Sequence, residues 1–444
     1  MVAEKVGGRE EADNASQPSA LSSRLEAALS SRRDRQMLRS LDPSPSSSSS
    51  LPLVDFSSND YLSFSRSPLL RKKLLTAIHE PSFLPYGPPS SRLLDGNSPH
   101  HLSFESRLSS FFGSESALLF NSGFDANTGL WACLPGPEDY ILFDELVHAS
   151  MHDGMRASRV PKDRRRPFRH NDVSALEEQV RKLEVEDEGV TKGEKSVWIG
   201  VESLYSMDGD LAPLQEMVDV AERILPARNG HFVVDEAHSV GLYGPSGRGL
   251  VAALKLKDQI TVRVHTFGKA LACSGAAVLT SPLIRNYLTN YARPLIYSTA
   301  ATRMSVAAAE KAIEMLEEGR GEEPASHVHS LARLFIARLA SLPATSSIAL
   351  PPHLLALRHN PQHPLTSPII PLLTSRPRPL AAFLREEGFL TRPITYPTVP
   401  HGEERVRVCL HAGNTEEEVA GLADSAKRWV EQEERRPMLL QAKL

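Results

Sequence analysis

The chain has 444 residues, of which 41% are hydrophobic and 23% charged, and its net charge is −4 at pH 7. This composition excludes a wholly disordered chain and provides enough apolar material for two or three domains. The nearly balanced charge excludes a global basic field, so neither a nucleic acid nor a membrane is an expected partner. The separated cysteines Cys133, Cys273 and Cys409 favour a reducing compartment over a disulfide framework.

Residues 1–54 are expected to form an N-terminal arm. After a polar start, residues 22–39 have a helical pattern of leucines among arginines, and the serine run at 46–50 indicates a low-complexity linker. Acidic residues and the lack of an apolar core argue against a secretory signal or a transit peptide here.

From 55 to 300, short apolar runs alternate with helical patterns. The runs typical of strands are 117–120, 140–143, 196–201, 232–234 and 276–279. Helical patterns lie at 176–183 and 214–224. The alternation predicts an α/β domain with a mostly parallel sheet that is covered on both faces. In such sheets, ligands bind beyond the carboxyl ends of the strands.

Residues 301–436 are expected to form a smaller C-terminal α+β domain. One or two long helices over 301–342 are followed by a proline-rich stretch of little periodicity at 343–379. A helix, a strand over 406–410 and a final helix complete this domain.

The tail is expected to cover 437–444, because Pro437 should end the last helix. Its last three residues, Ala442-Lys443-Leu444, are a conservative variant of the Ser-Lys-Leu signal that the peroxisomal import receptor binds. We therefore predict a peroxisomal location, and a cytoplasmic one if this signal is not read.

Lys269 is the first candidate for chemistry. It follows the apolar residues Val262 and Val264 and is flanked by the small residues Gly268 and Ala270. A buried lysine has a depressed pKa and can act as a nucleophile or form a Schiff base. The alternative is an ordinary surface lysine in a turn.

Asp235 follows the apolar run 232–234 directly, so it should lie at the carboxyl end of a buried strand. A carboxylate there can pair with a pyridinium nitrogen or hold a metal, and His238 can bind the same ligand. The alternative is that Asp235 caps a helix.

His148 and the Ser122-Gly123 pair also follow predicted strands. An imidazole at His148 can stack on an aromatic cofactor and pass protons, although a lone histidine is often structural. Ser122 and Gly123 lie where a helix should begin, which is a site suited to phosphate.

Together these features are typical of an enzyme that uses pyridoxal 5′-phosphate. Over residues 28–425 the chain resembles the α-oxoamine synthase family of fold-type I pyridoxal-phosphate transferases. The segments that carry the resemblance are Phe56–Leu62, Ser203–Asp210, Thr266–Lys269 and Leu295–Thr299.

The resemblance implies catalytic roles for three residues. Lys269 holds the cofactor as a Schiff base and moves a proton, Asp235 keeps the ring nitrogen protonated, and His148 stacks on the ring. The other residues that the resemblance places at the cofactor are Ser122, Gly123, Phe124, Ser206, His238 and Thr266. Ser298 and Thr299 match residues that the family lends to its partner's phosphate site, which implies a homodimer. The alternative is an ordinary helix N-cap, which is compatible with that role.

The substrate residues that the resemblance implies are Arg39, Asn59, His148, Glu202, Arg392 and Thr398. Within the family, Arg166–Val173 and Thr391–Pro400 look most like the 8-amino-7-oxononanoate synthases of biotin biosynthesis. These enzymes join L-alanine to an acyl thioester such as pimeloyl-CoA and release carbon dioxide. No metal is expected.

Alternatives within the family stay open. They are a 2-amino-3-oxobutyrate ligase, a condensing enzyme of secondary metabolism that joins an acyl-CoA to an amino acid, and a non-catalytic partner subunit. The chain also departs from the family pattern at Tyr86–Arg92 and at Ala272, which stands where the family has glycine.

Overall fold

The computed structural model describes residues 19–35, 37–39, 41, 53–225, 227–343, 346–356 and 366–441, and it divides the chain into two compact units, 1–52 and 53–444. In the first unit, helix α1 (Ala20–Asp34) is capped by Ser19, whose Oγ accepts the N–H of Ser22. The helix ends at Asp34 rather than at the predicted Arg39. None of its residues is buried, so no packing extends it further.

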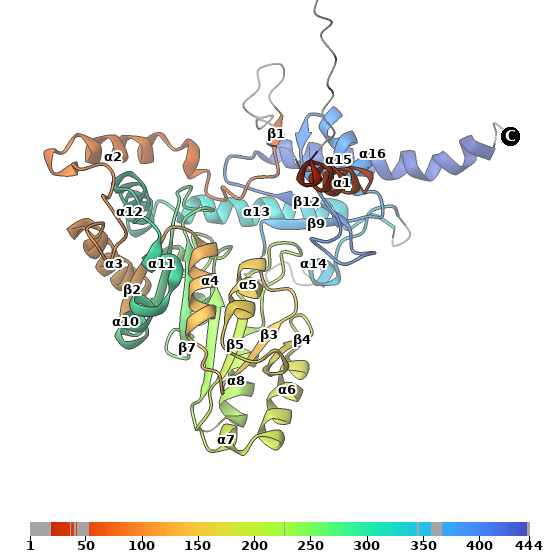
Figure 1. Cartoon of the computed structure of the whole chain (residues 1–444). Helices are drawn as coiled ribbons and strands as arrows, with labels where there is room; N and C mark the ends of the chain where they lie inside the picture. Colours follow the sequence, from red (N-terminus) through yellow and green to blue (C-terminus); the bar gives the residue numbers. More distant parts are fainter. Residues whose placement is uncertain are drawn as a thin grey trace, which may run out of the picture. The chain divides into compact units, whose positions relative to one another are not determined.

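A seven-stranded sheet forms the centre of the second unit (Figure 1). Its strands are β2 (Ser116–Phe120), β3 (Tyr140–Asp144), β4 (Arg165–Phe168), β5 (Val197–Glu202), β6 (Gly230–Asp235), β7 (Ile260–Thr266) and β8 (Ala276–Thr280). The order is β2-β8-β7-β6-β5-β3-β4. β8 alone runs opposite to the other six strands, so the predicted mostly parallel sheet is confirmed.

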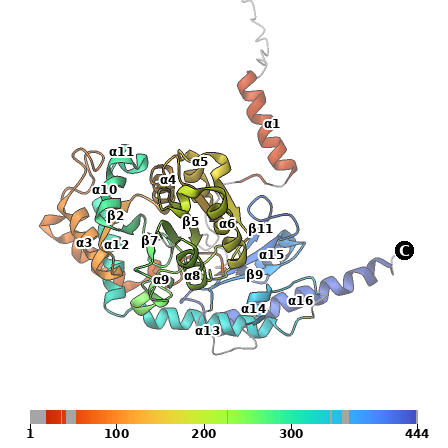
Figure 2. The same cartoon turned by 90° about the horizontal axis from the view of Figure 1, so that it is seen from below.

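Helices cover this sheet on both sides. In Figure 2, α4 (Gly123–Cys133) and α5 (Ala149–Ala157) lie on one side of the strands, and α8 (Leu214–Ile224) and α9 (Leu250–Ala253) lie on the other. Gly154 lets α4 and α5 pack closely, because a Cβ at this position would lie 2.7 Å from the Cβ of Trp131. The apolar core between these helices and the sheet includes Trp131, Met151 and Val201.

Further helices surround the sheet or lead to the C-terminal part. They are α2 (Pro68–His79), α3 (Pro99–Phe112), α6 (Val173–Glu186), α7 (Glu188–Thr191), α10 (Pro282–Tyr291), α11 (Arg293–Tyr297), α12 (Arg303–Glu317) and α13 (Glu322–Leu339). Short 3₁₀ turns are η2 (Phe64–Arg66), η3 (Pro81–Phe83), η4 (Lys162–Arg164) and η5 (Pro245–Gly247). In Figures 1 and 2, α13 extends from beside the large sheet to the C-terminal sheet, where it packs against α16.

The C-terminal sheet has the antiparallel order β11 (Arg392–Ile394), β12 (Arg405–Cys409), β9 (Ile369–Leu373). Its helices are α14 (Pro352–Ala356), α15 (Pro377–Glu386) and α16 (Glu416–Gln441). β1 (Val54–Asp55) pairs with β10 (Phe389–Leu390), so the chain joins this part immediately after residue 53. The sequence predicted no element over β9. Its Pro371 is compatible with a strand because β9 lies at the edge of the sheet.

The prediction that Pro437 ends the last helix is wrong, because α16 continues to Gln441. A proline removes one backbone donor and strains a helix, but the helix can continue beyond it. The targeting tripeptide Ala442–Leu444 lies outside the described residues. In the described part of the chain, no helix is long and apolar enough to cross a membrane.

Candidate active site

The carboxyl ends of β5, β6 and β7 bring three predicted site residues together. Glu202 and Asp235 are the last residues of neighbouring parallel strands and lie directly opposite each other, and Thr266 ends the next strand. Both carboxyl groups are buried. Burial and the nearby charge of Asp235 hold the pKa of Glu202 well above its usual range.

Asp235 is not a helix cap. Its Oδ1 accepts the backbone N–H of Ala237 over 2.9 Å, and its Oδ2 accepts the side-chain amide of Asn127 over 2.7 Å. Asn127 belongs to α4, so this contact joins a helix to the end of β6. The two bonds fix the orientation of the Asp235 carboxyl group.

Lys269 lies in the loop after β7 and is half-buried rather than on an exposed turn. Burial lowers the pKa of its amine, although the charges of Asp235 and Glu202 oppose this shift. The loop is held by two backbone hydrogen bonds, from Ala272 N to Lys269 O and from Cys273 N to Phe267 O, each of 2.8 Å. The structure therefore places an amine of lowered pKa beside two carboxyl groups.

His148 is the residue that precedes α5, and its ring caps that helix. Its Nδ1 accepts the backbone N–H of Ser150 over 3.2 Å and lies 2.7 Å from the Ser150 hydroxyl. Burial lowers the pKa of His148. The ring of Phe124 meets it edge-on, with ring centroids 6.4 Å apart. The helix-capping role and a role at the cofactor are thus compatible in one side chain.

The start of α4 and the end of β7 form a cradle of the kind that suits a phosphate. Ser122 caps α4 by accepting the N–H of Asp125 over 3.0 Å, so the free N–H groups of Gly123 and Phe124 point outward from the helix start. A Cβ on Gly123 would lie 3.3 Å from the Cβ of Thr266. Glycine therefore leaves room between these two residues, and the site fits a pyridoxal phosphate with its phosphate in this cradle.

A series of hydrogen bonds connects His238 to the C-terminal sheet. The hydroxyl of Tyr61 lies 2.7 Å from His238 Nδ1 and donates to Asn59 Oδ1 over 3.2 Å. Asn59 Oδ1 also accepts from Arg407 over 3.0 Å, and Arg407 Nε donates to the carbonyl of Ser206 over 2.6 Å. Burial, together with the charges of Lys269 and Arg407, holds the pKa of His238 well below its usual range.

Asn127, Ser150, Tyr61 and Arg407 are site residues that the sequence did not single out. The signal was present for two of them. Asn127 is a polar residue among the buried positions of α4, and Arg407 alternates with valines in β12, whose five residues are all buried.

Four other predicted residues occupy more exposed positions. Arg392 is exposed at the start of β11, directly opposite Arg407 in the register, and Thr398 is exposed in the turn that follows β11. Ser298 and Thr299 follow α11, and the N-cap of α12 is Thr302, so the prediction that this pair forms a helix N-cap is wrong. The Thr299 carbonyl accepts from Asn121, next to the phosphate cradle.

Two predicted substrate residues are placed differently from the rest. Arg39 belongs to the first unit, whereas the other site residues belong to the second. Asn59 Oδ1 accepts hydrogen bonds from Arg407 and Tyr61, and no hydrogen bond from Asn59 to Glu202 is found among the described residues.

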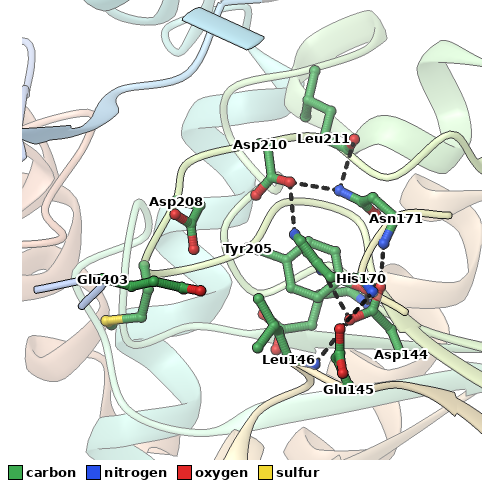
Figure 3. A network of polar contacts seen from close by, with 12 residues as sticks. Asp144, Glu145, Leu146, His170, Asn171, Tyr205, Asp208, Asp210, Leu211 and Glu403 are labelled. Carbon is green, nitrogen blue, oxygen red and sulfur yellow. Dashed lines mark hydrogen bonds and ion pairs between the residues drawn. The ribbon is translucent and has the colours of Figure 1, made fainter. Parts of the chain in front are cut away.

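The loop that carries Ser206 is held from both sides, and Figure 3 shows the side around His170. On one side, His170 lies 2.9 Å from Asp144 Oδ1 through Nδ1 and 2.7 Å from Asp210 Oδ2 through Nε2. Burial opposes a charge on the ring, but hydrogen bonds to both carboxylates raise the pKa of His170 to about 10. On the other side, Arg405 of β12 pairs with Asp208. The loop therefore connects the large sheet to the C-terminal sheet.

Comparison with known proteins identifies the family. The sequence profile of the family "aminotransferase class I and II" matches residues 52–425. The chain belongs to this family. It is similar to 8-amino-7-oxononanoate synthase of Emericella nidulans, with 44% identity over 94% of this chain and 98% of that protein. It is also similar to aminoacyl transferase sphA of Byssochlamys spectabilis, with 36% identity over 89% of this chain and 84% of that protein.

Among solved structures, the chain resembles a serine palmitoyltransferase from S. paucimobilis with pyridoxal phosphate and myriocin bound. The TM-score is 0.76 and the identity 25%, over 93% of this chain and 99% of that one. These likenesses confirm three predictions, which are the α-oxoamine synthase branch of the family, the fold-type I architecture and dependence on pyridoxal phosphate. The chain is thus a pyridoxal-phosphate-dependent transferase that condenses an acyl thioester with an amino acid.

Proposed function

We propose that the protein condenses L-alanine with pimeloyl-CoA and releases carbon dioxide, as an 8-amino-7-oxononanoate synthase. The observation that carries this proposal is the 44% identity to the Emericella nidulans synthase along 98% of that protein. The arrangement of Lys269, Asp235 and His148 around one cradle supports it, because it supplies the groups that this chemistry needs.

When bound, pyridoxal phosphate supplies the electron sink for the substrate's Cα carbanion. The N–H groups of Gly123 and Phe124 and the hydroxyl of Thr266 would hold its phosphate. Asp235 would keep a proton on the ring nitrogen, since a nearby carboxylate favours the protonated form of that nitrogen. Ser206 and His238 would bind the phenolic oxygen.

Lys269 would hold the cofactor and later move a proton at the substrate's Cα. Its lowered pKa makes a neutral amine more accessible at physiological pH, and only the neutral amine can accept that proton. His148 lies beside Lys269 and would donate a hydrogen bond to the substrate carbonyl during loss of carbon dioxide. Both side chains would therefore act on the same part of the substrate.

Arg407 and Asn59 are the best-placed pair for the amino-acid carboxylate. Arg407 is buried, and it donates hydrogen bonds to two neutral groups, the side-chain oxygen of Asn59 and the carbonyl of Ser206. A carboxylate substrate would provide the missing counter-charge through a bidentate pair. Arg392, which the resemblance suggested for this role, is exposed on the neighbouring strand and would instead face the acyl substrate together with Thr398. Arg39 stays a candidate for the same substrate.

The active form is proposed to be a homodimer in which Ser298 and Thr299 reach the partner's phosphate site. Large apolar side chains are exposed near this pair, including Leu94 at 72% and Tyr297 at 71%. A bridge between Ser91 and Thr299 brings the two segments together. Exposed apolar residues that gather in this way mark an interaction surface. Light scattering on the purified protein would measure the mass directly.

A second candidate function is the condensation carried out by an aminoacyl transferase such as sphA. The 36% identity to that protein over 89% of this chain favours it. The two functions differ in the acyl chain and the amino acid rather than in the cofactor chemistry. Peroxisomal location is a further proposal, which rests only on the tripeptide Ala442–Leu444.

The test is a matrix of steady-state assays with alanine, glycine and serine against pimeloyl, acetyl and long-chain thioesters. We expect kcat/KM to be highest for alanine with pimeloyl-CoA, and a preference for any other pair would refute the assignment. Lys269→Ala should abolish turnover while the circular dichroism stays unchanged. Lys257→Ala removes an exposed lysine and serves as the control.

A further inference from the structure

The side chain of Asn127 joins the two groups that act on either side of the cofactor site. Its Nδ2 donates to Asp235 Oδ2 over 2.7 Å and to Ser150 Oγ over 3.0 Å. An ionised carboxylate only accepts hydrogen bonds, so the amide nitrogen rather than the oxygen must face Asp235. The orientation of the Asn127 amide therefore follows from its partner.

Ser150 carries this constraint to His148. Because its Oγ accepts from Asn127, its own hydrogen is free to point to His148 Nδ1, which is 2.7 Å away. The backbone N–H of Ser150 also donates to Nδ1, over 3.2 Å. A ring nitrogen that faces two donors must use its lone pair, so the proton of the neutral imidazole lies on Nε2.

The surroundings of Asn127 indicate that this side chain does not increase the stability of the fold. The residue is 1% exposed, and its Oδ1 is buried without a hydrogen-bond partner in the described part of the chain. Such an orphan oxygen costs free energy that an apolar side chain of similar size would avoid. The close approach of α4 and α5 depends on Gly154, where a Cβ would lie 2.8 Å from the carbonyl oxygen of Asn127.

We propose that Asn127 and Ser150 are positioning residues that orient the Asp235 carboxylate and fix the Nε2–H tautomer of His148. His148 then offers its Nε2–H as a hydrogen-bond donor. Asp235 would keep its carboxylate directed at the ring nitrogen of the cofactor. The catalytic role of the two residues rests on the proposed function, whereas their hydrogen bonds are observed in this chain.

Matched variants distinguish the contact from Asn127 to Asp235 from the contact of Ser150 with His148. Asn127→Leu removes both hydrogen bonds of the Asn127 amide, whereas Ser150→Ala removes only the hydroxyl contact to His148 Nδ1 and keeps the backbone N–H of residue 150. Asn229→Leu is the control, because Asn229 is also buried, donates twice through Nδ2 and has an unpartnered Oδ1, but lies just before the amino end of β6. Pyridoxal phosphate affinity of the apoprotein and ¹⁵N spectra of labelled histidines are the readouts. The His148 signals are assigned by their loss in His148→Gln.

We expect Asn127→Leu to weaken cofactor affinity tenfold or more and to shift His148 from the Nε2–H form to a mixture of tautomers. Ser150→Ala should shift the tautomer but change cofactor affinity less than threefold, and Asn229→Leu should change neither. The proposal is overturned if Asn127→Leu leaves both readouts as in the parent, or if Asn229→Leu reproduces its losses. If Asn127→Leu does not fold, an unchanged tautomer of His148 in Ser150→Ala overturns the proposal that Ser150 fixes this tautomer. Neither readout uses turnover, so failure of the proposed reaction would be seen separately.

Discussion

Arg407 donates from its guanidinium to Asn59 Oδ1 over 3.0 Å, which ties β12 of the C-terminal sheet to the segment that follows β1. Its Nε is engaged by the Ser206 carbonyl, on the loop that His170 and Arg405 hold in place. No ion pair to Arg407 occurs within the described residues. A buried cation in this position is prepared for an anionic substrate group.

The first prediction compares the two arginines that face each other across β11 and β12. Arg407→Lys should raise the KM for alanine tenfold or more, about 1.4 kcal/mol, because an ammonium cannot form the bidentate pair. Arg392→Lys, at an exposed position, should change that KM less than threefold. Steady-state kinetics with varied alanine decide between them. A larger rise in KM for Arg392→Lys than for Arg407→Lys would show that Arg392 binds the carboxylate of the amino acid.

Asp235 carries the second prediction. Asp235→Asn keeps the shape of the side chain and its bond from Ala237, but removes the charge that holds a proton on the ring nitrogen. We expect the protein to bind cofactor and to lose at least tenfold in kcat, where each tenfold loss corresponds to about 1.4 kcal/mol of barrier. A kcat within threefold of the parent would rule out the role of Asp235 at the ring nitrogen.

In the large sheet, the sequence predicted the strands that are continuous apolar runs and missed β4 and β7, which contain charged or polar residues. β4 begins with two arginines, and β7 contains Arg263 and His265. Both residues of β7 are buried because each finds a partner far along the chain. Arg263 donates to the carbonyl of Phe112, and His265 pairs with Glu236. Periodicity within a segment cannot reveal such partners.

The same reason explains which parts of the site were predictable. Lys269, Asp235 and His148 could be found because each lies at or shortly after the carboxyl end of a strand, and the carboxyl ends of parallel strands meet at one edge. Asn127 and Arg407 act through contacts between elements that are more than 100 residues apart in the sequence, as in the Asn127–Asp235 pair. Their positions depend on helix packing and on how the C-terminal sheet docks.

His170 predicts a pH dependence of stability. Its pKa in the folded state is raised to about 10, against 6.5 for an unperturbed histidine. A group whose pKa is raised on folding contributes its full stability below the unfolded value and loses it as pH rises through the folded value. We therefore expect the urea midpoint of the parent protein to fall between pH 6.5 and about 10.

The variant His170→Gln should lower the midpoint at pH 6 and flatten this slope. His231→Gln is the control, since burial lowers the pKa of His231 and leaves it neutral over the same range. An unchanged slope in His170→Gln would mean that the imidazole is not charged between Asp144 and Asp210.

Ala272 is the residue where a single substitution should stabilise the protein. Its φ is 52°, in the left-handed region, and its N–H closes the turn onto the carbonyl of Lys269 over 2.8 Å. A left-handed backbone costs a residue with a Cβ about 1–2 kcal/mol of folding free energy. Glycine avoids this cost, but it loses more conformational entropy on folding, which costs about 0.4–1 kcal/mol. Ala272→Gly should therefore gain about 0.5–1 kcal/mol and raise the urea midpoint. Ala309→Gly, inside α12 with helical backbone, should lower it by contrast. If Ala272→Gly also lowers the midpoint, the turn that holds Lys269 is not strained, and the departure from the family's glycine has no cost in stability.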